Sequence, residues 1–193
     1  MGTHVVVGAG EVGSTTALEL AARGHEVKLV TRSRSGPVHA SIERVSADAS
    51  DPAALTRIAT GADAIYNCVN PPGYHQWEEI WPPLAASFMK SAQATAAVLV
   101  TMSNLYGYGP LDHPMTEHDP LASTGKKGQI RTRMWNDALA AHEAGLLRAT
   151  EARASDFYGD ASTNTHFGRN AAKLLAGKRA QVVGDPDLPH SWT

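Results

Sequence analysis

The sequence contains a single cysteine, Cys68, among its 193 residues. One cysteine excludes an internal disulfide framework and is typical of a reducing compartment. Basic blocks are also lacking and the net charge is −2, so we expect no nucleic-acid partner. No apolar run is long enough to span a bilayer, and the first predicted strand begins too early to leave room for a signal peptide. These absences predict a cytoplasmic protein without a membrane partner.

A metal-binding pattern is missing as well, although the chain has nine histidines. None of them lies in an H-E-x-x-H pair or in a cysteine–histidine cluster, which are the spacings that zinc sites typically use. We therefore expect solvated or hydrogen-bonded histidines and no metal site.

What the sequence does contain is a glycine-rich turn close to its N-terminus. An apolar run at residues 4–7 leads into three glycines spaced G-x-G-x-x-G, and a helical pattern follows. In a dinucleotide-binding unit the first glycine permits the tight turn, the second lets the backbone approach a pyrophosphate, and the third lets helix and strand pack closely. The first N–H groups of the helix and its dipole then face the phosphates. A glycine-rich turn without a ligand is the alternative. The cofactor-binding residues predicted here are Gly8, Gly10, Glu11, Val12 and Gly13.

The end of the second predicted strand, residues 26–31, bears on the choice between NAD and NADP. A site that prefers NAD usually carries an acidic residue there, which accepts a hydrogen bond from the ribose 2′-hydroxyl. Residues 28–37 contain none, and Arg32, Ser33 and Arg34 stand there instead. Guanidinium and hydroxyl groups suit a 2′-phosphate. We expect NADP, with NAD as the alternative; a solvated basic loop would have the same composition.

Further cofactor contacts are expected where two later strands end. A strand at residues 42–47 ends at Asp48, which could reach an adenine amino group or could be a turn aspartate. A strand at residues 63–69 stops at Asn70 and Pro71. Loops at the carboxyl ends of strands line the ligand crevice of a doubly wound sheet. We therefore expect Asn70 and Pro71 beside the ribose or the nicotinamide.

The alternation of strand and helix patterns predicts an α/β fold with a Rossmann-type, doubly wound parallel sheet. The predicted domains are an NAD(P)-binding Rossmann domain over residues 1–155 and the start of a small C-terminal substrate lobe over residues 156–193. The predicted fifth strand, residues 97–101, is followed by Ser103, Asn104 and Tyr106. A hydroxyl, an amide and a phenol at this position predict the catalytic end of the crevice. A flexible loop over 111–128 and a helix over 129–143 come next.

Several local features together resemble the extended short-chain dehydrogenase/reductases. The subgroup is the one loosely called NAD-dependent epimerase/dehydratase-like, including its atypical members. The resemblance runs over the whole chain and implies hydride transfer to or from the nicotinamide C4, on a carbonyl or secondary alcohol of a small-molecule substrate. It rests on the G-A-G-x-x-G turn, Asp48, S-N-L-Y-G at 103–107, Thr116-Glu117 with Pro120, and R-A-S-D-F-Y-G at 153–159.

The chain departs from that family at its acid/base pair. The family carries Tyr-x-x-x-Lys on the helix after the fifth strand, but residues 110–156 contain no tyrosine. Lys127 and Arg131 have the same spacing, so we place Lys127 at the tyrosine position and Arg131 at the lysine position. A neutral Lys127 could transfer a proton, Arg131 could hold a ribose hydroxyl or polarise a substrate oxygen, and Tyr106 is the rival acid. The alternatives are that both cations lie on a solvated face, or that the helix begins after Gly128.

A second departure is length, because relatives continue further into a substrate lobe. We expect a chain truncated at its C-terminus or a reduced member, with uncovered apolar surface and self-association into a homo-oligomer. Two functions stay open at this point. One is an NADP-dependent oxidoreductase or epimerase. The other is a non-catalytic dinucleotide-binding or sensing module that has lost the Tyr-x-x-x-Lys pair.

Overall fold

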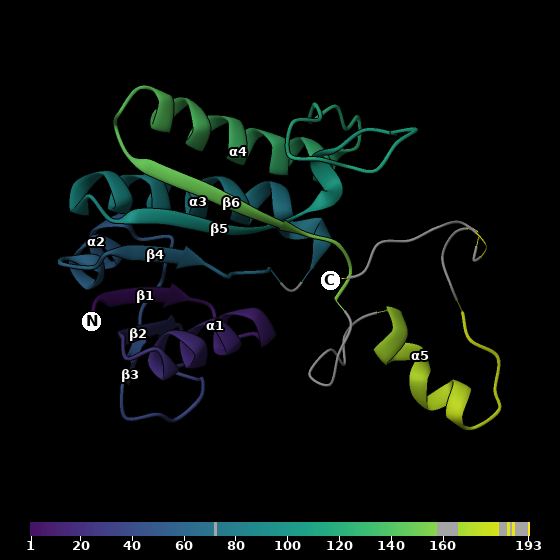
Figure 1. Cartoon of the computed structure of the whole chain (residues 1–193), viewed down its shortest axis with the longest axis horizontal. Helices are drawn as coiled ribbons and strands as arrows, with labels where there is room; N and C mark the ends of the chain where they lie inside the picture. The colour runs from purple at the N-terminus through teal and green to yellow at the C-terminus, as the bar shows by residue number, and fades with distance from the viewer. Residues whose placement is uncertain (72, 158–165, 182–184, 186, 188–192) are drawn as a thin grey trace. The chain divides into compact units, whose positions relative to one another are not determined.

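A computed structural model describes residues 1–71, 73–157, 166–181, 185, 187 and 193 (Figure 1). Their contacts divide the chain into two compact units, Met1–Ala152 and Arg153–Thr193. The second unit contains the helix α5 (His166–Leu175). Within this unit the buried Asn170 side chain donates to the Gln181 carbonyl and accepts from the Gln181 N–H.

The first unit is built on a six-stranded parallel sheet with the order β3-β2-β1-β4-β5-β6. This order reverses direction between β1 and β4, as in a Rossmann-type fold, and a ligand crevice is expected outside the strand ends at that point. The predicted α/β, doubly wound parallel fold is therefore confirmed. The strands are β1 (Thr3–Val7), β2 (Glu26–Thr31), β3 (Ile42–Ser46), β4 (Ala64–Asn67), β5 (Val98–Asn104) and β6 (Arg148–Ala154).

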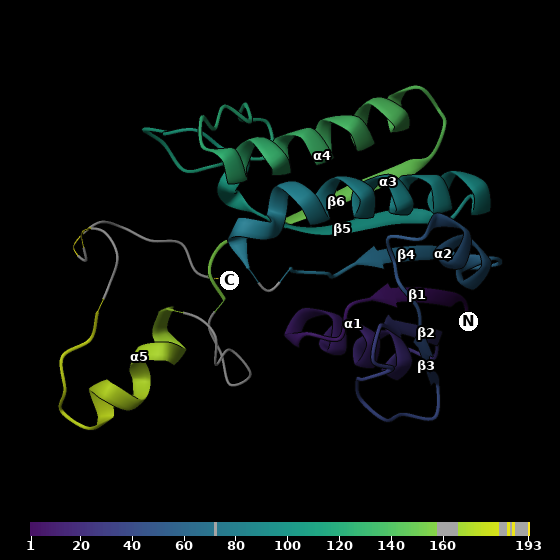
Figure 2. The same ribbon diagram turned by 180° about the vertical axis from the view of Figure 1, so that it is seen from behind.

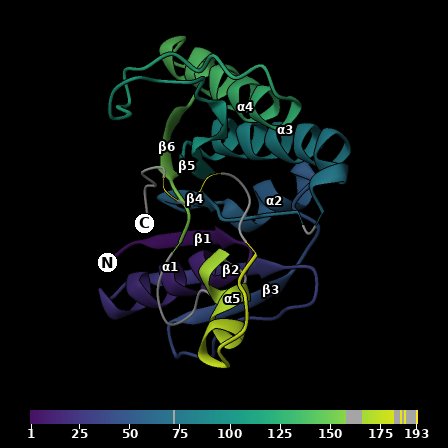
Figure 3. The ribbon, with the colours of Figure 1, turned by 90° about the vertical axis from the view of Figure 1, so that its right-hand side faces the viewer.

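Helices cover both faces of the sheet, with α1 on one side and α2, α3 and α4 on the other (Figures 2 and 3). Successive side chains of a strand point to opposite faces, so Val5 and Val7 of β1 join one hydrophobic cluster and Val6 joins the other. The first cluster is closed by α2, α3 and α4, and the second by α1. Burial on both faces explains the continuous apolar runs of the central strands. The helices are α1 (Glu11–Ala22), α2 (Pro52–Ala59), α3 (Trp77–Thr95) and α4 (Lys126–Glu143).

Two element boundaries differ from those predicted, and both matter for the site. Strand β5 runs on to Asn104, so Ser103 and Asn104 belong to the strand and not to the loop after it. Helix α4 begins at Lys126, three residues earlier than predicted, so Lys127 and Gly128 lie in its first turn. The expectation that the helix begins only after Gly128 is therefore wrong.

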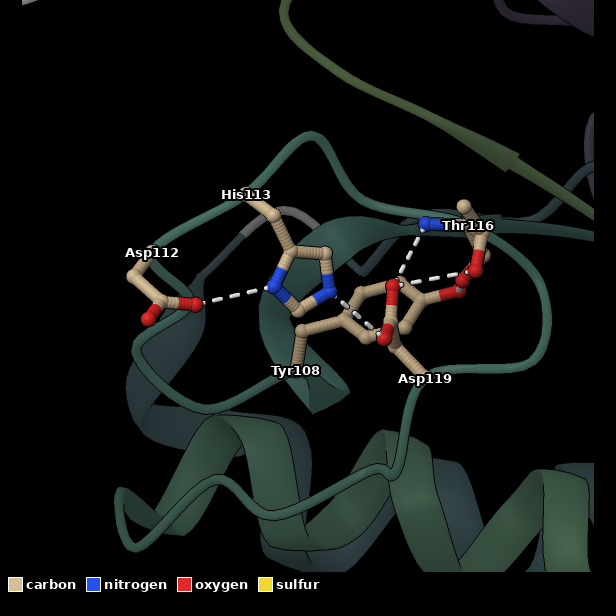
Figure 4. Close-up of polar contacts among 5 residues, drawn as sticks. All are labelled: Tyr108, Asp112, His113, Thr116 and Asp119. Carbon is tan, nitrogen blue, oxygen red and sulfur yellow. Dashed lines mark hydrogen bonds and ion pairs between the residues drawn. The ribbon is translucent and has the colours of Figure 1, made fainter.

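The loop between β5 and α4, predicted as flexible, is organised by side-chain hydrogen bonds (Figure 4). The His113 ring lies between two carboxylates, with Nδ1 2.9 Å from Asp112 and Nε2 2.9 Å from Asp119. Asp119 also accepts from the backbone N–H of Thr116 at 2.7 Å and from its hydroxyl at 3.0 Å. The Tyr108 hydroxyl donates to the Thr116 carbonyl at 3.0 Å. Because His113 changes its charge with pH, we expect the stability of this loop to depend on pH.

We expect the loop to become less protected from amide exchange as the pH rises above 6.5. The hydrogen bonds to Asp112 and then to Asp119 raise the pKa of His113 above its ordinary value of 6.5. The stabilisation is therefore complete below pH 6.5 and is lost as the pH rises through the folded-state pKa. Hydrogen exchange at the Thr116 amide, corrected for the intrinsic effect of pH, measures it. A His113→Asn variant should show no such transition, and wild-type protection that grows over this range would contradict the prediction.

Candidate functional site

The glycine turn joins β1 to α1, and each of its three glycines has a distinct environment. Gly8 has a φ of +98°, and a Cβ there would lie 2.7 Å from the Cys68 carbonyl oxygen. A Cβ on Gly13 would overlap the Gly8 carbonyl oxygen. By contrast, no heavy atom of the described chain lies within 4 Å of the position that a Cβ would take on Gly10. Gly8 and Gly13 thus serve the fold of the turn, whereas Gly10 faces open space.

A cleft of about 560 Å³ opens beside this turn, at the carboxyl ends of β1 to β4 and against α3. It lies where the strand order reverses. The cleft brings together seven of the eleven predicted cofactor residues: Gly8, Gly10, Arg32, Ser33, Asp48, Asn70 and Pro71.

The other four predicted cofactor residues are not in the wall of this cleft as the described part of the chain forms it. Glu11, Val12 and Gly13 form the first turn of α1. Arg34 has a φ of +56°, and its Nε donates to the Arg44 carbonyl at 2.9 Å. The structure therefore separates Arg32, which faces the cleft, from Arg34, which braces the β2–β3 connection.

Asp48 is a turn aspartate whose side chain also lies in the wall of the cleft. Its carboxylate accepts from the backbone N–H of Ser50 at 2.9 Å and from the Ser50 hydroxyl at 2.8 Å, which makes it a turn aspartate. These hydrogen bonds, the backbone one first, lower the pKa of Asp48, and the charge of Arg32 adds to the effect. Asp48 also lines the cleft. Its carboxylate is thus ionised and oriented in the cleft wall at neutral pH.

Cys68 lies in the cleft wall, but its thiol is not poised for nucleophilic chemistry. Burial raises the pKa of the thiol to about 11, against a smaller opposing effect of a hydrogen bond with Thr16. The thiolate is the nucleophilic form of cysteine. Cys68 is therefore protonated at neutral pH and contributes to the wall as a small apolar side chain.

Three of the five predicted catalytic residues meet in an aromatic cluster around the start of α3. The Tyr106 hydroxyl lies 3.0 Å from the hydroxyl of Tyr74, which belongs to the short helix η1 (Tyr74–Gln76). The Lys127 Nζ lies 3.8 Å from the centre of the Tyr74 ring. The guanidinium of Arg131 stacks on Trp81 at 4.1 Å and on Trp77 at 4.9 Å. Tyr106, Lys127 and Arg131, chosen from different parts of the sequence, thus contact one group of rings.

Arg131 is buried between α3 and α4, and only 6% of its surface is exposed. Burial lowers its pKa to about 10, with smaller opposing effects of Glu151, Tyr106 and Tyr74. The guanidinium is therefore charged at neutral pH. Its Nε and Nη1 have no hydrogen-bond partner among the described residues, and cation–π contacts with the two indoles offset part of the cost of burial. The position of Arg131 excludes a solvated face for this cation.

The other two predicted catalytic residues have different surroundings. Ser103 is buried in β5, with 7% of its surface exposed. The side-chain Oδ1 of Asn104 accepts from the Tyr106 backbone N–H at 3.1 Å, and so caps the short helix η2 (Leu105–Gly107). Asn104 thus positions Tyr106 in space.

A glycine in the first turn of α4 allows this cluster to form. A Cβ on Gly128 would overlap the Tyr106 carbonyl oxygen and the Ser123 side chain. Glycine weakens a helix interior by about 1 kcal/mol relative to alanine. Here it permits α4 to lie directly against η2, and this approach brings Lys127 and Arg131 to the cluster of rings that contains Tyr106.

No site role was predicted for Tyr74, and the helical spacing of Trp77 and Trp81 indicates core or interface packing. Both indoles are in fact buried, with at most 2% exposure, but they also carry the Arg131 contact. The available signal was the aromatic spacing of residues 74, 77 and 81, which places three rings on one side of a helical segment.

A family model described as NAD(P)H-binding matches residues 8–144, which is most of the chain. The chain belongs to the NAD(P)H-binding family. A search of curated proteins gave no significant match.

Solved structures show the same fold at low sequence identity. The dTDP-glucose 4,6-dehydratase of Bacillus anthracis, in complex with NAD, has a TM-score of 0.85 and 18% identity, over 100% of this chain and 67% of its own. The Bordetella bronchiseptica enzyme WbmG, also with NAD, has a TM-score of 0.79 and 17% identity, over 92% and 61%. The UDP-N-acetylglucosamine 4-epimerase of Methanobrevibacter ruminantium has a TM-score of 0.84 and 15% identity, over 100% and 68%. This chain thus spans about two thirds of their length.

The residues of this NAD(P)H-binding protein fit a dinucleotide. The open space beside Gly10 is where a backbone has to let a pyrophosphate approach. Gly10 is the N-cap residue of α1, and no side chain of the described residues caps this end of the helix. The first N–H groups of α1 are therefore available to an anion. The cleft volume is within the range of small-molecule sites. The predicted side chains that line the cleft and are available to a dinucleotide there are Arg32, Ser33, Asp48, Asn70 and Pro71.

The described residues contain neither a metal-ligand cluster nor a membrane-spanning helix. No group of three histidine, cysteine, aspartate or glutamate side chains there is arranged to hold a metal ion. None of the described helices is both long enough and apolar enough to cross a membrane.

Proposed function

We propose that the protein is an NADP-dependent oxidoreductase or epimerase that acts on a carbonyl or a secondary alcohol. The observation that carries this proposal is the Tyr106 phenol, which lies among two cations and a second phenol just beyond β5. β5 is the neighbour of β4, whose end borders the dinucleotide cleft. A proton-transferring group at the same edge of the sheet as the cofactor cleft is what carbonyl reduction requires.

The proposed division of roles follows from the contacts of each residue. When bound, the nicotinamide supplies or accepts a hydride. Tyr106 gives a proton to the substrate oxygen, or takes one from it, and Asn104 holds the backbone of Tyr106 in place. Arg131 supplies a buried positive charge. Lys127 lies over a ring face, a contact that attracts the ammonium form, so we assign it the role of a fixed cation and assign the proton transfer to Tyr106.

The preference for NADP is proposed from the wall of the cleft. Arg32 and Ser33 face it, and a guanidinium forms charge-assisted hydrogen bonds to phosphate. Arg34 faces away and serves as the matched control.

Arg32→Ala is expected to weaken NADPH binding by about 10–150-fold, the equivalent of about 1.5–3 kcal/mol for a charged hydrogen bond. NADH binding should change little, because NADH lacks the 2′-phosphate. Arg34→Ala should leave the ratio of the two affinities unchanged. Fluorescence titration with both cofactors measures these effects. Tighter binding of NADH than of NADPH by the wild type would refute the assignment.

A non-catalytic dinucleotide-binding module is the second candidate. It is favoured by the burial of the Arg131 Nε and Nη1, which a ligand cannot reach without movement of the side chain. Cofactor titration followed by a turnover screen over carbonyl compounds separates the two functions. Binding of NADPH with turnover supports the enzyme, and binding without turnover of any compound supports the module.

A further inference from the structure

The two phenols of the aromatic cluster come from different parts of the chain. Tyr74 lies in η1, between β4 and α3, and Tyr106 lies in η2, directly after β5. Their hydroxyl oxygens are 3.0 Å apart although the residues are 32 positions apart. Both remain partly exposed, Tyr74 by 53% and Tyr106 by 41%, so water and a substrate can reach them.

The orientation of Tyr74 is determined by contacts on its ring. Its centroid lies 5.1 Å from that of Trp77 and 6.3 Å from that of Tyr106. Trp77 in turn stacks on Tyr106, with centroids 6.1 Å apart and 28° between the planes. The Lys127 ammonium covers a face of the Tyr74 ring. The three rings and the cation thus hold the two hydroxyls within hydrogen-bond distance of each other.

We propose that Tyr74 is a positioning residue that also relays protons to Tyr106, a role that rests on the function proposed above. During reduction, the substrate carbon receives a hydride from the reduced nicotinamide coenzyme, and the Tyr106 O–H bond breaks as the substrate O–H bond forms. The Tyr74 O–H bond breaks as its proton passes to the Tyr106 oxygen, and water restores the proton of Tyr74. The net change is the addition of one hydride and one solvent proton to the carbonyl group.

The test compares Tyr74→Phe with Tyr66→Phe in the full chain. Tyr66 is a matched control because its hydroxyl, 3.5 Å from His4, belongs to neither the cleft wall nor the aromatic cluster. Tyr74→Phe keeps the ring contacts and removes the hydroxyl. We expect it to lower kcat by about 10–100-fold, less than the 10²–10⁴-fold typical of a positioned acid. KM and the NADPH Kd should stay within about twofold.

Mixtures of H₂O and D₂O distinguish a relay from a structural role. Because two O–H bonds change in one step, a plot of the wild-type kcat against the deuterium fraction of the solvent should be curved. The same plot for Tyr74→Phe should be linear, because one O–H bond remains. Tyr66→Phe should keep the curve. Tyr74→His, whose ring nitrogen can carry a proton, should recover part of the lost kcat.

Thermal unfolding gives a readout that does not depend on turnover. If the two hydroxyls are bonded, the combined Tyr74→Phe and Tyr106→Phe variant should lose less Tm than the sum of the two single losses. Additive losses would overturn the pairing. The relay would be overturned, while the proposed function stands, if Tyr74→Phe kept the kcat of the wild type and its curved isotope dependence. A change in KM alone in this variant would also overturn the relay. A wild type that binds NADPH and turns over no carbonyl compound would overturn both.

Discussion

Tyr106→Phe is expected to reduce kcat by about 10²–10⁴-fold, the range typical of a general acid or base. NADPH affinity should stay within about twofold, because Tyr106 lies outside the described wall of the dinucleotide cleft. The ring of Tyr106 would still stack on Trp77, so the fold of the cluster should survive the loss of the hydroxyl. Steady-state turnover of a carbonyl substrate, with cofactor titration in parallel, measures both quantities.

Lys127→Met is the companion variant, because Lys127 belongs to the same cluster and lies over the Tyr74 ring. Removal of a fixed cation that transfers no proton should lower kcat less than removal of the acid. We therefore expect a smaller loss of kcat in Lys127→Met than in Tyr106→Phe. The opposite order, with Lys127→Met inactive and Tyr106→Phe active, would identify Lys127 as the acid. Equal activity of both variants and wild type would place the chemistry elsewhere.

Gly13→Ala is expected to lower the free energy of unfolding by about 3 kcal/mol, the upper end of the usual cost of overpacking. The added methyl group would overlap the Gly8 carbonyl oxygen, and a backbone atom cannot move aside as the end of a flexible side chain can. The turn between β1 and α1 would have to open, so NADPH binding should be lost together with stability. Denaturant unfolding and cofactor titration measure the two effects.

Gly10→Ala is the matched variant, and it should separate binding from folding. Gly10 has a φ of −72°, which alanine adopts readily, and no described atom lies near the new methyl group. The free energy of unfolding should change by no more than about 1 kcal/mol, the usual cost of a poorer helix cap. NADPH binding should nevertheless fall sharply, since the methyl group would occupy the approach of the pyrophosphate. Unchanged binding by Gly10→Ala would contradict the proposed placement of the cofactor.

Most of the predicted cofactor residues that line the cleft could be brought together from the sequence because they lie next to strand ends. Gly8, Asp48 and Asn70 each follow a β-strand, and the carboxyl ends of parallel strands meet at one edge of the sheet whatever the details of packing. Arg32 and Arg34 were predicted together, but of the two only Arg32 lines the cleft. The sequence does not distinguish two arginines of one loop; in the structure Arg34 has a positive φ and its Nε donates to the Arg44 carbonyl.

The aromatic half of the site could be predicted only in part. The spacing of Lys127 and Arg131 indicated a shared helix face, but not which rings that face would meet. Gly128 lowered the expectation of a helix there because its local propensity is poor. The close approach of α4 to η2 reverses that judgement, since a side chain at this position would overlap the Tyr106 backbone.

The sequence by itself therefore determined the α/β class, the first five strands and the glycine turn, because these depend on local periodicity and on residues adjacent in the chain. Only the tertiary structure decided that Tyr74 meets Tyr106 and that Arg131 is buried against Trp77 and Trp81. Those contacts join η1, η2, α3 and α4, whose separations in the sequence carry no periodic signal. They form because both faces of a parallel sheet must be covered, and packing α3 and α4 over the same face brings their polar and aromatic side chains together.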